Sequence, residues 1–260
     1  MVDYSSLESL IDQPVDCVFF DAIESTNDYL LSQPFSETTQ VCHTREQTQG
    51  KGQHGRVWCS QKDGSVLFSI RQNFDVSCDL SGLSLVIALA IIESLEKTCA
   101  VGKLGIKWPN DIYFEDQKLS GILLENQLHG NRQSVVIGVG VNYALGENLD
   151  CETPWTDLTT ISDNLVNIKV LTGAIINTIF VFIKRFEAAG FEGFQSEWTT
   201  YDILKGQRAT VTRDNNPFSG EVMGVNNKGA LLISSANGLE QMYSSEHIRY
   251  NVNTDKTIEK

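Results

Sequence analysis

Residues 47–58 read Gln47-Thr48-Gln49-Gly50-Lys51-Gly52-Gln53-His54-Gly55-Arg56-Val57-Trp58, a loop with three glycines and two cations that ends on an aromatic side chain. Glycine lets backbone N–H groups turn toward an anion without steric cost, and lysine and arginine supply the countercharge. The spacing fits neither the GxxxxGK[ST] of a P-loop nor the GxGxxG of a dinucleotide-binding fold. Taken alone, the stretch is at least as typical of a surface loop between two strands, so its meaning depends on its surroundings.

Three further segments accompany this loop. Ser25-Thr26-Asn27 precedes it, and Lys107-Trp108-Pro109-Asn110-Asp111 and Lys118-Leu119-Ser120-Gly121-Ile122-Leu123-Leu124-Glu125 follow it. In this order the segments closely resemble the biotin protein ligases, whose pattern is a Ser-Thr-Asn turn, a glycine-basic loop ending in Trp, KWPND, and a KL-small-G-I-L strand. The resemblance continues through Ile137-Gly138-Val139-Gly140-Val141-Asn142 and covers nearly the whole chain. The joint occurrence is far more specific than any single motif.

The apolar pattern along the chain predicts an α+β fold. Helices are expected over 81–98 and 166–189, with a short one over 28–32 that Asn27 or a neighbour caps. The expected strands gather before and after one central helix, which favours a mixed sheet over a doubly wound one. The resemblance implies the mixed sheet that biotin ligases share with class II aminoacyl-tRNA synthetases. Strands are expected at 17–21, 40–44, 66–71, 105–108, 112–115, 122–125 and 134–142.

After Trp198 the pattern changes to short strands separated by turn sequences. Four strands are expected, at 208–212, 220–225, 230–234 and 240–243, with turns at 214–217, 226–229 and 237–238. This predicts a separate small β-barrel of about fifty residues, and the resemblance identifies it with the SH3-like C-terminal domain of biotin ligases. We therefore expect a catalytic domain over 1–203, the SH3-like domain over 204–252 and a polar tail over 253–260.

The formal net charge of −13 is unevenly distributed. Residues 1–42 carry eight acidic side chains and no Lys or Arg, residues 43–118 carry nine of each sign, and the remainder carries sixteen acidic and eleven basic. The only neutral segment holds the glycine loop and Lys118, which indicates a site for a small anion. Because phosphate contacts need cations, we expect no nucleic-acid partner. We expect the ligase-only type, without the winged helix-turn-helix that some biotin ligases carry.

Other features of the composition favour a cytoplasmic protein. The first residues have neither the positive charge nor the apolar stretch of a secretory signal. The longest apolar run, around 170–183, is interrupted by polar residues and falls short of the roughly 20 residues that a membrane span needs. The six cysteines show no CxxC spacing, so we expect them to be reduced and do not expect a zinc site.

The resemblance implies a two-step reaction that uses ATP and Mg²⁺. The carboxylate of biotin is first joined to the α-phosphorus of ATP, which gives biotinyl-5′-AMP. A lysine of a biotin carboxyl carrier protein, from acetyl-CoA carboxylase or a related biotin-dependent enzyme, then accepts the biotinyl group. Because two anions meet in the first step, cations and backbone N–H groups are needed more than a protein nucleophile. The metal ligands, the acceptor's identity and the oligomeric state, a homodimer included, stay open.

Lys118 ranks first among the residues to which the resemblance assigns roles, because it bridges the biotin carboxylate and the phosphate. A lysine beside a strand would otherwise be interpreted as a solubilising group. The residues expected to carry catalysis are Lys118, Lys51, Asp111 and Asn110. Those expected around biotin are Ser25, Thr26, Asn27, Gln47, Gly50, Lys51, Gly52, Gln53, Lys118 and Gly121. Those expected around the nucleotide are Lys51, Arg56, Trp58, Asn110, Asn142 and Trp155.

Alternatives stay open at several positions. Gln53 stands where the family loop often has a second arginine that helps to retain the adenylate, and Arg56 either compensates for it or only caps the loop. Trp58 either packs against the ligand or anchors the end of the loop in the core. Trp155 lies in a segment that loosely resembles a loop closing over adenosine.

The sequence is less consistent with two other functions. A lipoate–protein ligase would share the fold and the adenylation chemistry, but this loop lacks the Arg-Arg-x-Ser-Gly-Gly-Gly type of signature. A biotin-responsive transcriptional regulator belongs to a different class, and the absence of cations in residues 1–42 disfavours it.

Overall fold

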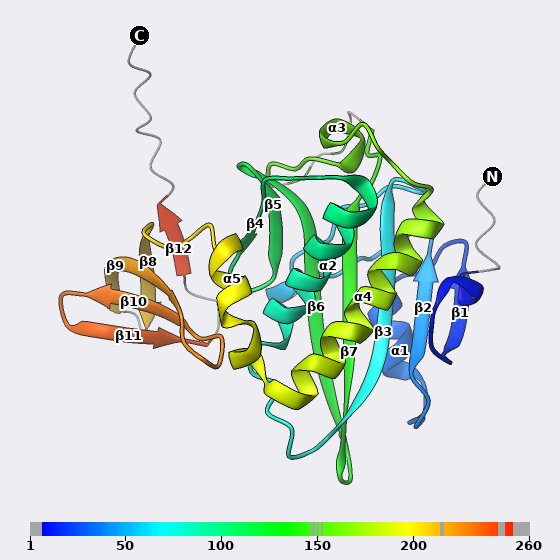
Figure 1. The fold of residues 1–260 in the computed structure, drawn as a ribbon, viewed down its shortest axis with the longest axis horizontal. Coiled ribbons are helices and arrows are strands. Elements are labelled where there is room, and N and C mark those ends of the chain that lie inside the picture. The colour runs from blue at the N-terminus through cyan, green and yellow to red at the C-terminus, as the bar shows by residue number, and fades with distance from the viewer. Residues whose placement is uncertain are drawn as a thin grey trace.

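A seven-stranded mixed sheet forms the centre of the molecule (Figure 1). The computed structural model describes residues 7–146, 149, 151, 153–213, 216–243 and 248–251. The strand order is β1-β2-β3-β7-β6-β5-β4, in which β1 and β2 pair in parallel and all other neighbours are antiparallel. The mixed sheet is therefore confirmed. Its strands are β1 (Asp16–Phe20), β2 (Gln40–Thr44), β3 (Ser65–Asp75), β4 (Leu104–Lys107), β5 (Asp111–Phe114), β6 (Gln117–His129) and β7 (Arg132–Asn142).

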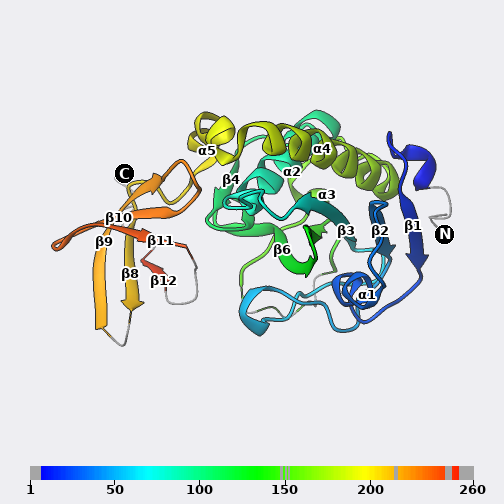
Figure 2. The same ribbon diagram turned by 90° about the horizontal axis from the view of Figure 1, so that it is seen from below.

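Helices cover the two faces of this sheet unequally. The long helices α2 (Leu83–Cys99) and α4 (Ile168–Ala189) pack on one face, and the short helix α1 (Thr26–Ser32) lies on the other (Figure 2). The middle of α2 is buried almost all round, as its apolar sequence predicts, whereas α4 buries one face. Both long helices lie where the sequence predicts them. Among the described residues, no helix has the length and apolar character needed to cross a membrane.

Two local predictions need correction. Helix α1 begins at Thr26 and not at Asp28, and its cap is Ser25, whose Oγ accepts a hydrogen bond from the Asp28 backbone N–H at 3.3 Å. Asn27 is therefore inside the helix, with its side chain available for tertiary contacts. Strand β6 is also much longer than the predicted 122–125. It pairs with β5 on one side and β7 on the other, and these partners extend it through polar residues that no local apolar pattern marks.

The C-terminal region folds as a second antiparallel sheet beyond the helices α3 (Leu158–Ile161) and α5 (Gln195–Tyr201). The four predicted strands are present, and a fifth strand was not predicted. Over the described residues the sheet is open, with β11 and β12 at its edges, so no closed barrel is seen there. The tail over 253–260 lies outside the described residues. The strands are β8 (Arg208–Arg213), β9 (Asn216–Val225), β10 (Leu231–Ser235), β11 (Gly238–Met242) and β12 (Ile248–Asn251), in the order β11-β10-β9-β8-β12.

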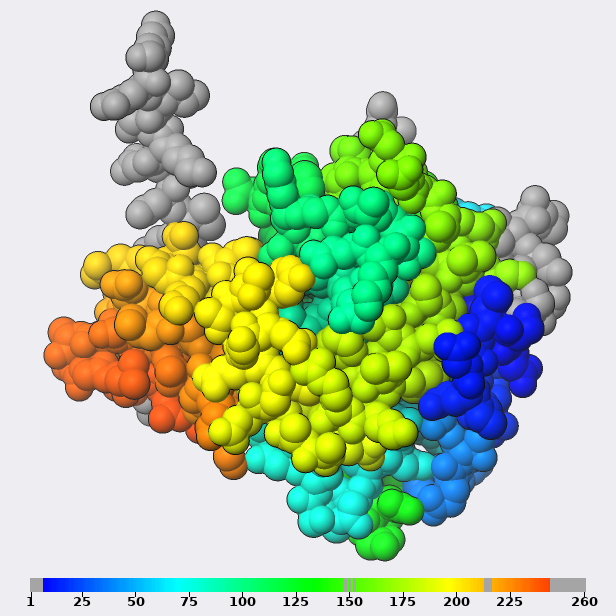
Figure 3. All heavy atoms as spheres, viewed as in Figure 1, coloured from blue at the N-terminus to red at the C-terminus, as the bar shows by residue number. Residues whose placement is uncertain are grey.

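The C-terminal sheet lies beside α5 (Figure 3), and it contacts the turn between β4 and β5 and the segment that leads into α2. The Trp108 indole N–H donates to the Gly229 carbonyl at 2.9 Å, and Lys228 forms an ion pair with Asp79 at 3.0 Å. Buried side chains of the two sheets belong to one hydrophobic cluster. The tryptophan of the KWPND segment therefore anchors the C-terminal sheet, while the following Asn110 and Asp111 face the opposite way, toward the cavity described next.

Candidate functional site

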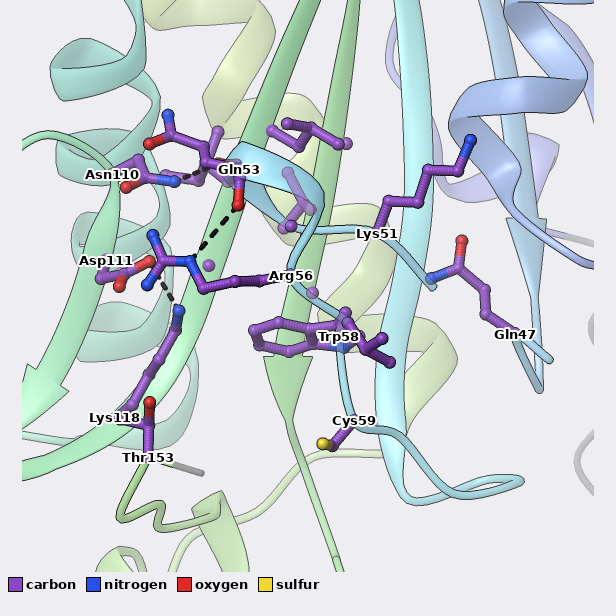
Figure 4. A pocket seen from close by; sticks show the side chains of 18 of the residues that line it. Gln47, Lys51, Gln53, Arg56, Trp58, Cys59, Asn110, Asp111, Lys118 and Thr153 are labelled. Carbon is purple, nitrogen blue, oxygen red and sulfur yellow. Dashed lines mark hydrogen bonds and ion pairs between the residues drawn. The ribbon is translucent and has the colours of Figure 1, made fainter. Parts of the chain in front are cut away.

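A cavity of about 460 Å³ lies on the face of the sheet that carries α1 (Figure 4). Its walls are the start of α1, the glycine loop, the first residues of β6, the end of β7 and residues 153–155. Every predicted site residue except Gly50 lines it, namely Ser25, Thr26, Asn27, Gln47, Lys51, Gly52, Gln53, Arg56, Trp58, Asn110, Asp111, Lys118, Gly121, Asn142 and Trp155. Gly50 lies behind Trp58, whose backbone N–H donates to the Gly50 carbonyl at 2.9 Å.

Three glycines of β6 and β7 form the floor of this cavity. Gly121 and Gly140 are directly paired across the two strands, and Gly138 follows at the next position on the same face. A Cβ at Gly140 would lie 2.5 Å from the Trp58 ring, and one at Gly138 would lie 2.3 Å from Asn27 Oδ1. Sequence reasoning missed Gly138 and Gly140, because a single GxG is weak evidence until its strand is known to border a cavity.

The indole of Trp58 lies on this glycine floor and not in the main core. A Cβ at Gly121 would also approach its ring, at 2.8 Å. The ammonium of Lys118 lies 5.5 Å from the ring centroid on the cavity side, within the range of a cation–π interaction. Trp58 therefore anchors the end of the loop on the glycine floor and not in the core, and its ring forms part of the cavity wall.

One end of the cavity carries neutral hydrogen-bonding side chains, of which Thr26 and Asn27 are buried and Gln47 is half-buried. The backbone N–H and the hydroxyl of Thr26 both donate to Gln47 Oε1, at 2.8 and 3.0 Å. Asn27 donates to Glu125 Oε2 at 2.8 Å, and its Oδ1 accepts from Ser69 at 2.5 Å. Sequence reasoning missed Ser69 and Glu125, since only the fold brings their strands β3 and β6 to the start of α1.

At the opposite end of the cavity, cations surround one carboxylate. Lys118 Nζ lies 2.7 Å from Asp111 Oδ1, and both side chains are largely buried. Lys107 pairs with Asp111 across β4 and β5. Its pKa is lowered mainly by burial, and the nearby positive charges of Lys118 and Arg56 lower it further. Three cations around a single carboxylate make this end attractive to an anion.

The two cations of the glycine loop point to different places. Lys51 Nζ forms an ion pair with Asp28 of α1 at 2.7 Å, and this hydrogen-bonded partner raises the pKa of the lysine. Figure 4 shows Lys51 turned away from Asp111, while the Arg56 guanidinium points toward Asp111 and Lys118. Arg56 Nε donates to the Gln53 carbonyl at 3.3 Å. The structure therefore places Arg56, and not Lys51, at the cationic end.

Asn110 and Asn142 hold the cavity wall in place through backbone contacts. Asn110 Nδ2 donates to the Ile122 carbonyl at 2.6 Å. Asn142 Nδ2 donates to the carbonyls of Lys118 and Thr156, at 3.2 and 2.9 Å. The segment around Trp155 is thus tied to the start of β6, where it pairs in parallel with Lys118. This places Trp155 on the wall beside the cationic end, and its contact with adenosine stays a prediction.

The chain is similar in sequence to proteins of one known family. Residues 19–142 match the model of the biotin/lipoate A/B protein ligase family. The chain is 30% identical over 207 residues to the "Bifunctional ligase/repressor BirA" of Bacillus subtilis, covering 77% of this chain and 63% of that protein. It is 31% identical over 216 residues to the protein of the same name from Escherichia coli, covering 81% and 67%.

A solved structure shows the same fold over nearly its full length. The biotin protein ligase from Aquifex aeolicus in complex with biotin and ATP superimposes with a TM-score of 0.76 and 26% identity. The match covers 91% of this chain and 99% of that one. The chain therefore spans almost the whole of the Aquifex aeolicus structure but about two thirds of the Bacillus subtilis and Escherichia coli relatives.

Proposed function

This chain belongs to the biotin/lipoate A/B protein ligase family, and we propose that it is an ATP-dependent biotin–protein ligase. It would activate biotin as biotinyl-5′-AMP and transfer the biotinyl group to a lysine of a biotin carboxyl carrier protein. One observation carries the proposal. A single cavity joins an end with the neutral hydrogen-bonding side chains of Thr26, Asn27 and Gln47 to a cationic end at Lys118.

Biotin has the complementary polarity. Its ureido ring offers N–H donors and a carbonyl acceptor, which suit the hydroxyl of Thr26 and the amides of Asn27 and Gln47. Its carboxylate would then extend over the glycine floor toward Lys118. Lys118 already carries a carboxylate partner in Asp111. Substrate oxygens would share its ammonium, which brings two anions together without a protein nucleophile.

The loop cations are proposed to bind phosphate in different ways. Arg56 already points toward the cationic end, so its planar guanidinium is placed to meet phosphate oxygens. Lys51 would have to exchange Asp28 for phosphate before it could serve as the resemblance implies. The ion pair is half-exposed, and exposed pairs contribute only about 0–1 kcal/mol, so this exchange costs little.

The nucleotide would lie between Arg56 and the segment that carries Trp155. Asn142 is proposed to act there by holding that segment in place. Asp111 is the carboxylate best placed to meet Mg²⁺ bound to the phosphates. Mg²⁺ is usually held by one or two carboxylates together with substrate phosphates, so Asp111 would act with the phosphates and not as part of a protein cage. The bound ion would screen phosphate charge.

The biotin-ligase names of several relatives and the biotin complex of the Aquifex aeolicus structure support biotin over lipoate. We do not extend the proposal to the repressor activity named for the BirA proteins. Residues 1–42 provide no Lys or Arg for phosphate contacts. Because the reaction consumes ATP, we place the protein in the cytoplasm.

Pyrophosphate exchange into ATP tests the proposal, with biotin and lipoate compared as substrates. We expect exchange with biotin and none with lipoate. Lys118→Ala should abolish biotin-dependent exchange while the protein stays folded, and Lys97→Ala, which removes an exposed lysine paired with Glu93 on α2, should leave it unchanged. Lipoate-dependent exchange alone would reject the assignment, and normal exchange by folded Lys118→Ala would reject the role of that residue.

A further inference from the structure

Arg71 is a buried cation on β3 that lies outside the cavity. Its side chain is 1% exposed, and no ion pair found in the described part of the chain includes it. Burial lowers the pKa of its guanidinium. A buried charge without a counterion costs free energy unless it is hydrogen-bonded, so the guanidinium of Arg71 needs polar partners.

The compensation comes from backbone carbonyls at the end of α1. Arg71 Nη1 donates to the carbonyls of Leu30 and Gln33, at 2.9 and 3.0 Å, and Nη2 donates to the carbonyl of Pro34. The last carbonyls of a helix lack partners within the helix and carry the negative end of its dipole. Arg71 therefore caps the C-terminal end of α1 from the neighbouring sheet.

Two other side chains of β3 extend this attachment. Ser69 and Asn73 are two residues before and after Arg71, so all three share one face of the strand. Ser69 Oγ lies 2.7 Å from Thr26 Oγ1 and also contacts Asn27. Asn73 donates to the Ser36 carbonyl at 2.7 Å. Strand β3 thus holds α1 at its first turn, at its last turn and just beyond.

This attachment matters because α1 has only seven residues. A helix of that length is not stable in isolation, so its position depends on tertiary contacts. Its first turn supplies Ser25, Thr26 and Asn27 to the cavity wall. A shift at the far end of so short a helix is transmitted directly to that wall.

We propose that Arg71 is a positioning residue for the biotin-binding end of the cavity. By capping α1 from β3, it fixes the first turn of the helix where the ureido ring binds. The inference rests on the proposed function. The side-chain hydrogen bonds of Arg71 go to residues 30–34, whereas the nucleotide end is built from β6, β7 and residues 153–156. Loss of the cap should therefore weaken the binding of biotin and leave the binding of ATP unchanged.

The test compares Arg71→Met and Arg71→Lys with Arg132→Met, which removes a half-exposed arginine whose nearest carboxylate is 3.8 Å away. In pyrophosphate exchange, Arg71→Met should raise the KM for biotin about tenfold or more, because small misplacements of substrate-binding groups have large effects. The KM for ATP should change less than about twofold. Arg71→Lys should lie between wild type and Arg71→Met, and Arg132→Met should match wild type.

Hydrogen exchange of the α1 amides gives a readout that does not need activity. Residues 29–33 should exchange faster in Arg71→Lys than in Arg132→Met. If Arg71→Met does not fold, Arg71→Lys decides both measurements. An unchanged KM for biotin, or equal increases in the KM values for biotin and ATP, would overturn the positioning role. Unchanged hydrogen exchange of residues 29–33 would overturn the cap. If wild type shows no biotin-dependent exchange, the proposed function fails while the hydrogen-exchange test still stands.

Discussion

Replacing Gly140 by alanine should displace Trp58 and with it the end of the glycine loop. The added Cβ would lie 2.5 Å from Trp58 Cε2 and 2.6 Å from Cζ2, well inside van der Waals contact. Overpacking of this kind costs about 1–3 kcal/mol. The loop is partly exposed, so it can move to relieve the clash, and we expect most of the cost to appear in ligand binding and not in unfolding.

The expected loss in kcat/KM for biotin-dependent exchange is about five- to 150-fold, since 1.4 kcal/mol corresponds to a factor of ten. The melting temperature should fall by a few degrees at most, because 1 kcal/mol shifts it by about 2–4 °C in a protein of this size. Gly102→Ala is the matched control. It has ordinary backbone geometry and open space where its Cβ would stand, so both quantities should stay at the wild-type values.

A double-mutant cycle with Trp58→Leu separates the clash from other effects. The smaller side chain should remove most of the penalty of Gly140→Ala, so the two changes should be strongly non-additive. If folded Gly140→Ala keeps kcat/KM within about twofold of wild type, the packing of Trp58 on the glycine floor does not control the site. Additive losses in the cycle would also refute the reasoning.

Three further predictions follow from the loop and the core. Gln53→Arg should slow release of biotinyl-5′-AMP roughly tenfold or more, as expected for a new charge-assisted hydrogen bond, and unchanged dissociation of the purified adenylate would show that Arg56 already fills this role. Limited trypsin digestion should cut the ligand-free protein at Lys51 and Arg56, and biotin with ATP at ten times their dissociation constants should slow cleavage about tenfold. Equal rates with and without ligand would mean that the loop does not respond to substrate. Burial lowers the pKa of His43 from its ordinary value of 6.5 to about 4, so the unfolded chain takes up the proton first as pH falls. The stability that neutral His43 contributes is therefore complete above about pH 6.5 and is lost toward pH 4, and the loss is about 2 kcal/mol at pH 5. His43→Asn should make the melting temperature less sensitive to pH between 7 and 5, and an unaltered pH dependence would show that another group controls acid stability.

The local sequence determined which segments matter and most of the secondary structure. Runs of apolar residues located both long helices and the strands of the central sheet, because burial of apolar surface sets those patterns. The glycine loop, KWPND and the Lys118 segment all reach one cavity, as their resemblance to biotin ligases implied. The prediction fell short at β12 and along most of β6, where pairing with neighbouring strands, and not local composition, decides the structure.

Only the tertiary structure decided which contacts, and therefore which role, each of these residues has. It directed Lys51 to Asp28 and Arg56 to the cationic end, although both cations stand in one glycine-rich loop. It placed Gly140 beneath Trp58 and Arg71 behind α1. Each of these contacts joins residues far apart in the chain, and each depends on which face of a strand a residue occupies and which element covers that face. A local pattern fixes the residue type, but strand pairing and packing fix its partner, and at this site the partner determines the role.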